Sequence, residues 1–209
     1  MNQKKSKSPF PVPNSPLILI DNGHGADTPG KCSPDRRLRE YEWARRCARL
    51  IQDKLAAKGY EAVRIVPEDR DISLGERCRR VNAYCAEYGA DRCLLISIHN
   101  NASGSDGKWH DACGWSGWVY AKCSPGSKRL ARILFEEAKA RNLLGNRSVP
   151  ADRCWTANFY ILRHSLCPAV LTENLFQDNR ADVEYLLTQS GLETLAEMHV
   201  AALERYLKA

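Results

Sequence analysis

Two histidines in this sequence each stand shortly after an apolar run. His24 stands in a glycine-rich turn after residues 17–20, and His99 follows residues 93–98. Short apolar runs bounded by polar turns predict buried strands. The glycines beside His24 leave room around the imidazole for a ligand or a metal ion. A histidine in such a turn is also often a surface or capping residue, so a chemical role depends on partners.

Acidic residues occupy comparable positions. Glu40 and Glu42 lie in or just before the first turn of a predicted helix, where acids also interact favourably with the helix dipole. Glu173 comes directly after another apolar run, residues 169–172. The sequence therefore offers an acid at a helix start and an acid at a strand end.

These residue types suit a catalytic zinc site. Such sites take three protein ligands from His, Glu or Asp and leave one position for water, on which a further carboxylate acts as general base. The acids are not arranged in a His-Glu-x-x-His motif, so the site is not of the zincin type. A zinc hydrolase and an α/β domain with incidental histidines are both compatible with this pattern.

The elements that must position these residues alternate along the chain. Strands alternating with helices predict an α/β fold, with three layers and a mostly parallel, twisted sheet of about six strands that has helices on both faces. Sites in such sheets form at the carboxyl ends of the strands, where both histidines and Glu173 are expected. The predicted strands are 17–20, 62–66, 93–98, 118–121, 159–162 and 169–172, and the predicted helices are about 40–58, 73–87, 127–142, 181–187 and 190–207.

Composition limits the class of protein. The 209 residues, 44% hydrophobic and 27% charged, fit one soluble domain without a membrane helix. Residues 1–16 are basic and proline-rich, which predicts a flexible leader without a secretory signal. No linker follows, so residues 17–209 are expected to form a single domain. The nine cysteines are odd in number and lack a Cys-x-x-Cys pair, which argues against disulfides and favours a reducing compartment.

The formal net charge of +6 favours an anionic partner such as nucleic acid or a bacterial cell wall. The basic residues alternate with acids along the predicted helices, as on ordinary solvated faces, and form no concentrated stripe. We therefore expect no nucleic-acid binding.

Four short motifs follow one another along the chain. They are Leu-Ile-Asp-Asn-Gly-His-Gly at 19–25, Arg-Glu-Tyr-Glu at 39–42, Ser-Ile-His-Asn-Asn-Ala at 97–102 and Pro-Ala-Val-Leu-Thr-Glu-Asn at 168–174. In this order they resemble the motifs of the zinc-dependent N-acetylmuramoyl-L-alanine amidases with a type-3 amidase domain. The resemblance runs from about Leu17 to Leu207 and suggests a single-domain form like a phage lysin. It implies that the zinc ligands are His24, Glu40 and His99 and that Glu173 is the catalytic glutamate.

The sequence departs from the family pattern at two positions. Asn22 stands where the family usually has proline, which is expected to change only the turn. Ala44 stands where asparagine is common, so support for the glutamate ligand is expected to differ. Glu42 competes with Glu40 as the ligand, and the register of the following helix favours Glu40.

The resemblance implies hydrolysis of the amide between the lactyl group of N-acetylmuramic acid and L-alanine in peptidoglycan. A zinc peptidase acting on another amide of the stem peptide would use the same groups, and a non-enzymatic basic module that binds cell wall or nucleic acid is a further alternative. We expect a monomer without membrane insertion. It would be made in the cytoplasm and reach the wall as a phage-type lysin does, or be secreted if a signal had been removed.

Six further residues are candidates for contacting the substrate. Tryptophan faces suit sugar rings, and the planar fork of arginine suits carboxylates of the stem peptide, for which Arg147 and Arg153 are also available. Tryptophans in loops also commonly anchor the loop by burial. The six candidates are Asn100, Asn101, Trp109, Trp155, Arg163 and Asn174.

Overall fold

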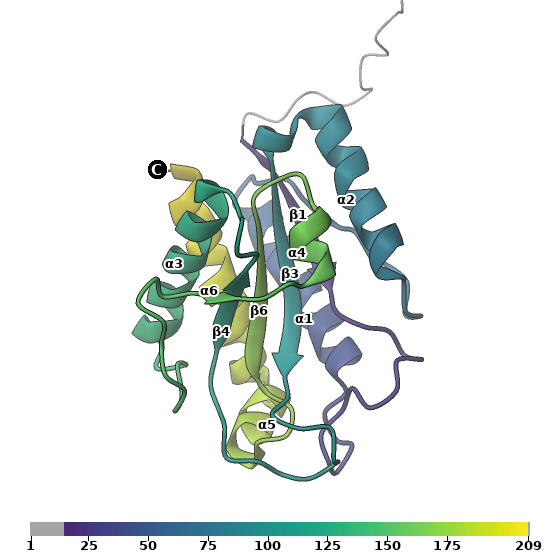
Figure 1. Ribbon diagram of the computed structural model, residues 1–209, viewed down its shortest axis with the longest axis vertical. Coiled ribbons are helices and arrows are strands. Elements are labelled where there is room, and N and C mark those ends of the chain that lie inside the picture. Colours follow the sequence, from purple (N-terminus) through teal and green to yellow (C-terminus); the bar gives the residue numbers. More distant parts are fainter. Residues whose placement is uncertain (1–14, 209) are drawn as a thin grey trace, which may run out of the picture.

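A six-stranded sheet runs through the centre of the molecule (Figure 1). The computed structural model describes residues 15–208, so nearly all of the predicted leader lies outside the described residues. The strand order is β2-β1-β3-β6-β4-β5, and only the β4–β6 pair is antiparallel. The strands are β1 (Leu17–Asn22), β2 (Ala62–Arg64), β3 (Cys93–Asn101), β4 (Ser116–Val119), β5 (Trp155–Thr156) and β6 (Ala169–Phe176).

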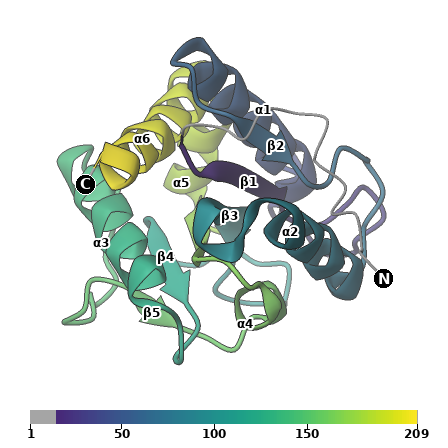
Figure 2. The same cartoon turned by 90° about the horizontal axis from the view of Figure 1, so that it is seen from above.

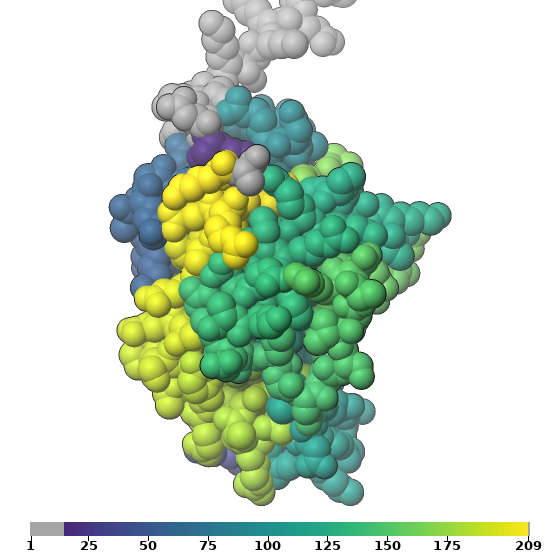
Figure 3. Space-filling model, turned by 90° about the vertical axis from the view of Figure 1, so that its left-hand side faces the viewer, coloured from purple at the N-terminus to yellow at the C-terminus, as the bar shows by residue number. Residues whose placement is uncertain are grey.

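Helices cover both faces of the sheet and confirm the predicted three layers (Figure 2). One face carries α1 (Glu40–Ala57), α3 (Pro125–Ala140), α5 (Arg180–Leu187) and α6 (Gln189–Lys208). The opposite face carries α2 (Leu74–Tyr88) and α4 (Tyr160–His164). Figure 3 shows α6 at the surface between α1 and α3. A short 3₁₀ helix, Ala90–Arg92, leads into β3.

The central strands are apolar on both sides because both faces are covered. In β1, Ile18 and Ile20 face the core under α1, whereas Leu17 and Leu19 face the core under α2. Successive side chains of a strand point to opposite faces, so a strand between two helical layers needs apolar residues at every position. This explains why residues 17–20 form a strand although apolar and polar residues do not alternate along them.

The prediction of a strand at 159–162 was wrong. This segment begins α4, a short helix in which Ile161 and Leu162 are buried in the core under α2. A run of four apolar residues suits a buried helical turn as well as a strand, and local sequence does not separate the two. The sixth strand is instead β5, a strand of two residues that pairs with β4 at the edge of the sheet. It lies in a stretch for which neither a strand nor a helix was predicted. Strand β4 itself begins two residues before the predicted start at 118.

Helix starts agree with prediction only in part. Ser73, at the predicted start of α2, caps this helix by accepting a hydrogen bond from the main-chain nitrogen of Glu76. The cap of α3 is Ser124, three residues before the predicted start at 127, and the hydroxyl of Ser127 instead accepts from the main-chain nitrogen of Ala169. At α6, which begins at Gln189, the side chain of Thr188 accepts from the main-chain nitrogen of Gly191, so the cap lies before the predicted start at 190.

All nine cysteines are free thiols. None of the helices between residues 15 and 208 is long and apolar enough to cross a bilayer.

Candidate metal centre and active site

The sheet brings the two histidines together at the carboxyl ends of neighbouring strands. Asn22 of β1 pairs with Ile98 of β3, and the main-chain nitrogen of Gly23 donates to the carbonyl of Ile98. His24 therefore leaves β1 next to His99, which is part of β3. This confirms the expected strand-end position of His24, whereas β3 continues two residues beyond His99.

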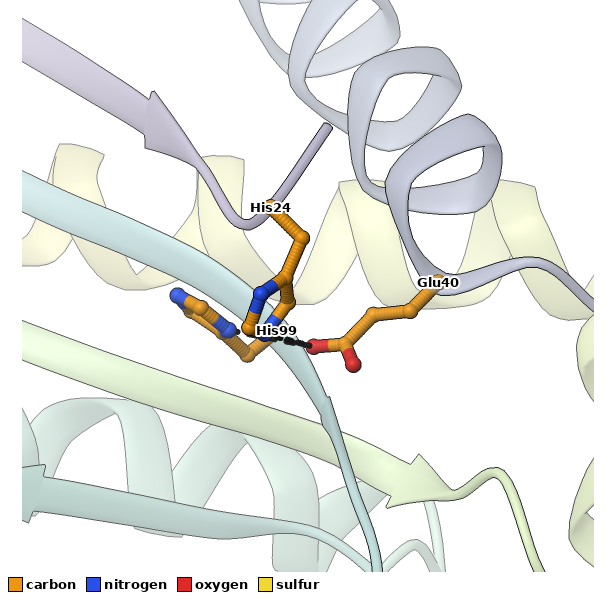
Figure 4. A group of neighbouring side chains, drawn as sticks. All are labelled: His24, Glu40 and His99. Carbon is orange, nitrogen blue, oxygen red and sulfur yellow. Dashed lines mark hydrogen bonds and ion pairs between the residues drawn. The ribbon is translucent and has the colours of Figure 1, made fainter. Parts of the chain in front are cut away.

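The carboxylate of Glu40 completes the cluster (Figure 4). Its Oε1 atom lies 3.0 Å from Nδ1 of His99 and 3.4 Å from Nε2 of His24. The main-chain nitrogen of Asn100 donates to the same oxygen over 3.1 Å. The ligand atoms of the three side chains lie within 4.8 Å of one another, so the group could hold a metal ion.

The chemistry of the cluster fits a metal ion. Glu40 is fully buried, and its Oε2 atom has no hydrogen-bond partner among the described residues. Burial raises the pKa of Glu40, but the hydrogen bonds to both histidines outweigh this and hold the pKa well below its usual range. An ionised, buried carboxylate with a free oxygen, beside two imidazoles, is a donor set typical of catalytic zinc.

The pKa of His99 responds to the same contact. Burial alone would lower it, but the hydrogen bond and charge of Glu40 raise the pKa of His99 above its ordinary value. A metal ion at this position would replace the proton that the pair otherwise attracts.

Gly23 and Gly25 are required by close contacts. A Cβ atom on Gly23 would lie 2.4 Å from the ring of His99, and one on Gly25 would lie 2.0 Å from the main-chain nitrogen of Asp71. Both distances are far below van der Waals contact. The two glycines therefore let the His99 ring and the loop at Asp71 pack directly against the backbone around His24.

Glu173 faces the cluster from the next strand. It pairs with His99 in the β3–β6 register, so the two side chains lie on the same face of the sheet. Desolvation raises the pKa of Glu173 to about 7, although the charge of His99 opposes the shift and that of Glu40 adds to it. Glu173 lies within β6 rather than after it, because the strand continues to Phe176. A carboxyl group with a pKa near neutrality can both accept and return a proton at physiological pH.

A cavity of about 510 Å³ opens beside these residues. His24, His99 and Glu173 line it together with side chains that were not predicted from the sequence. One comes from the loop between β1 and α1, and the others lie just before or in the first turn of α2 and at the start of α4. Those at α4 could be predicted only by knowing that Tyr160–His164 is helical. The additional lining residues include Lys31, Asp71, Ser73, Leu74, Phe159 and Tyr160.

Asn100 and Asn174, which were predicted to contact the substrate, are buried and lie outside the cavity lining. The Nδ2 atom of Asn174 donates a hydrogen bond of 3.0 Å to the carbonyl of His99. The Nδ2 atom of Asn100 donates a hydrogen bond of 2.6 Å to the carbonyl of Asn174. These bonds tie β3 to β6 where the register shifts after His99. The two asparagines thus hold the backbone at His99, a candidate metal ligand.

The other four predicted substrate residues lie outside the cavity lining. Trp109 packs on the core under α1, with the Arg180 guanidinium carbon 4.6 Å from its ring centre. Asn101 accepts a hydrogen bond from the neighbouring main chain, Arg163 is exposed on α4, and Trp155 lies on the edge strand β5.

The structure distinguishes Glu40 from Glu42. Glu42 is exposed and accepts a hydrogen bond from the Tyr41 hydroxyl, whereas Glu40 is the acid in the cluster. Ala44 offers no side-chain donor to Glu40. Among the described residues, the main-chain nitrogen of Asn100 is the only donor to this carboxylate besides the two histidines. Asn22 is buried, and neither polar atom of its side chain has a partner among the described residues.

The fold and the cluster together define an α/β domain with a candidate His–Glu–His metal site next to a glutamate. The sequence model of the N-acetylmuramoyl-L-alanine amidase family matches residues 18–205, and the chain belongs to this family. Family membership supports peptidoglycan amidase activity.

Three comparisons place the chain within that family. It is 32% identical over 193 residues to the sporulation-specific N-acetylmuramoyl-L-alanine amidase of Bacillus subtilis, covering 90% of this chain and 67% of the relative. It is 28% identical to the endolysin of Bacillus phage SPP1, covering 92% and 66%. The crystal structure of an N-acetylmuramoyl-L-alanine amidase from Clostridium difficile 630 superposes with a TM-score of 0.79 at 28% identity, covering 94% and 98%. The chain thus spans about two thirds of the length of these two curated relatives.

Proposed function

We propose that this chain hydrolyses the amide between the lactyl group of N-acetylmuramic acid and L-alanine in peptidoglycan, with zinc as its metal. The proposal is carried by one observation: a buried, ionised carboxylate is shared by two histidines, next to a second carboxyl group on the adjoining strand. The relatives named as amidases and as an endolysin support the same substrate. The catalytic unit would be a single domain, residues 17–209.

His24, Glu40 and His99 would hold the zinc ion. When bound, zinc supplies Lewis-acid polarisation of the amide carbonyl and makes water a better nucleophile near neutral pH. The protein contributes a rigid donor set, because His99 is part of β3, Glu40 is the first residue of α1 and His24 follows the end of β1 by two residues. The main-chain contact from Asn100 to Glu40 fixes the carboxylate without a flexible side chain.

Glu173 would move the protons. Its carboxylate accepts a proton from the attacking water and returns one to the nitrogen of L-alanine as the amide breaks. The pKa of about 7 suits both steps, because neither protonation state is strongly favoured at neutral pH. Its position beside His99 keeps the carboxyl group on the face of the sheet where the scissile amide would lie.

Digestion of purified peptidoglycan tests the proposal. We expect new L-alanine amino groups without new reducing sugars, loss of release with a chelator and recovery with added zinc. Amino groups on any residue other than L-alanine would indicate a peptidase for another amide. Reducing ends without amino groups would indicate a glycosidase and overturn the proposal.

A further inference from the structure

The guanidinium of Arg147 lies at the flank of the site, beyond Glu173. Its Nη1 atom donates to the hydroxyl of Ser116 over 3.1 Å. Ser116 pairs directly with Glu173 in the β4–β6 register, so both side chains lie on the same face. Arg147 follows α3 by several residues in sequence, and only the sheet brings it to this position.

Aromatic rings hold Arg147 in place. Its guanidinium carbon lies 5.1 Å from the ring centre of Trp155, 5.7 Å from that of Trp118 and 5.5 Å from that of Phe176. Trp118 also contacts Phe159, which lines the cavity. Such contacts stabilise a cation and restrict its orientation. The guanidinium is therefore fixed before any ligand arrives.

Arg147 forms no ion pair within residues 15–208, although it is half-buried. The buried Arg77, by contrast, pairs with Asp21 and Asp71. Burial lowers the pKa of Arg147, which reflects the cost of desolvating its charge. With one hydrogen bond to Ser116, the guanidinium keeps donors free for an anionic group.

We propose that Arg147 binds a free carboxylate on the peptide side of the scissile amide. This inference rests on the proposed function. The carboxyl group of N-acetylmuramic acid is consumed in the amide itself, so the glycan side offers no carboxylate near the bond. An acidic residue after L-alanine in the stem peptide offers a carboxylate on the peptide side of the bond. The planar fork of arginine binds carboxylates with two parallel hydrogen bonds.

Two muramyl peptides that differ at one group test this proposal. Both carry the same stem, with the carboxylate of the second residue either free or converted to a carboxamide. Charge-assisted hydrogen bonds of this kind predict that kcat/KM favours the free carboxylate by roughly 10- to 100-fold. Arg147→Met should bring that ratio close to one, and Arg147→Lys should retain part of it.

Arg153→Met is the matched control. Arg153 lies in the same loop, is exposed and pairs with Glu136, so its loss should leave the ratio and the zinc content as in the parent. A parent enzyme that does not discriminate, or an Arg147→Met variant with an unchanged ratio, would overturn the proposal.

Equilibrium binding of both peptides to the Glu173→Gln variant separates this inference from the proposed function. Dissociation constants measured there by calorimetry should show the same preference and its loss in the double variant with Arg147→Met. If the parent cleaves neither peptide, the amidase proposal fails, while the ratio of dissociation constants still decides whether Arg147 binds the carboxylate.

Discussion

The Nη2 atom of Arg77 donates a 3.1 Å hydrogen bond to the main-chain carbonyl of His24. Nη2 of Arg45 donates to the same carbonyl over 3.0 Å. His24 adopts a φ angle of 57°, in the left-handed region that residues other than glycine rarely occupy. Two buried arginines from α1 and α2 thus hold the backbone of a proposed metal ligand in a strained conformation.

We expect Arg77→Lys to weaken zinc binding roughly 10- to 100-fold, as loss of support behind a ligand does. One ammonium group cannot replace bonds to Asp21, Asp71 and the His24 carbonyl, so the free energy of unfolding should fall by roughly 1–3 kcal/mol. Competition with a zinc chelator gives the affinity, and the visible spectrum of the cobalt-substituted protein reports ligand geometry. Arg79→Lys, on the exposed side of α2, is the control. Equal zinc affinity in both variants would contradict this role.

Exchange of single acids for amides identifies the carboxylate ligand. Glu40→Gln should lose bound zinc, because the amide is neutral and cannot bind the metal as the buried carboxylate can. Glu42→Gln should keep a full complement, since this side chain is exposed and contacts Tyr41. Metal analysis by atomic emission after dialysis provides the measurement. Zinc loss in the Glu42 variant alone would reverse the assignment.

Glu173→Gln should separate zinc binding from hydrolysis. The amide keeps the shape of the side chain but cannot accept the proton of water, so the turnover number should fall by roughly 10²- to 10⁴-fold. Zinc content should match the parent, because Glu173 is not in the His–Glu–His group. His24→Ala, in comparison, should lose both. Parental turnover in Glu173→Gln would rule out Glu173 as the base.

His199 should make stability depend on pH. It is fully buried, its Nδ1 lies 2.7 Å from the Leu195 carbonyl and its Nε2 lies 3.0 Å from the Thr172 hydroxyl. Burial lowers the pKa of His199 from 6.5 to about 4. As the pH falls, the imidazole therefore binds a proton in the unfolded chain before it does so in the folded protein. The contribution of neutral His199 to the free energy of unfolding is intact above about pH 6.5 and is lost progressively towards pH 4, by about 3 kcal/mol in total.

Urea unfolding of the parent and of His199→Gln at pH 7.5, 6 and 5 measures this effect. The parent should lose more stability than the variant as the pH is lowered, because glutamine does not titrate in this range. Comparing the two proteins removes the contribution of the other histidines, which both contain. Parallel pH curves for the two proteins would show that His199 does not titrate as described.

The sequence alone was sufficient for the parts of this protein that depend on local pattern. The apolar runs before His24, His99 and Glu173 predicted three parallel strands, and the helical register after Glu40 predicted which acid faces inward. Because parallel strands end at one edge of a sheet, these runs also predicted where the site lies. His24, His99 and Glu173 do lie near the same edge of the sheet, although β3 and β6 run further than expected.

Only the tertiary structure decided which polar residues are buried and which line the cavity. Asn100 and Asn174 lie in the motifs, yet their side chains donate to main-chain carbonyls of β6 and β3. Residues Tyr160–His164 form a helix because the core under α2 accepts the adjacent side chains of Ile161 and Leu162. Arg147 reaches Ser116 across 31 residues of sequence. Contacts of this kind arise from packing between distant segments, which local periodicity does not encode.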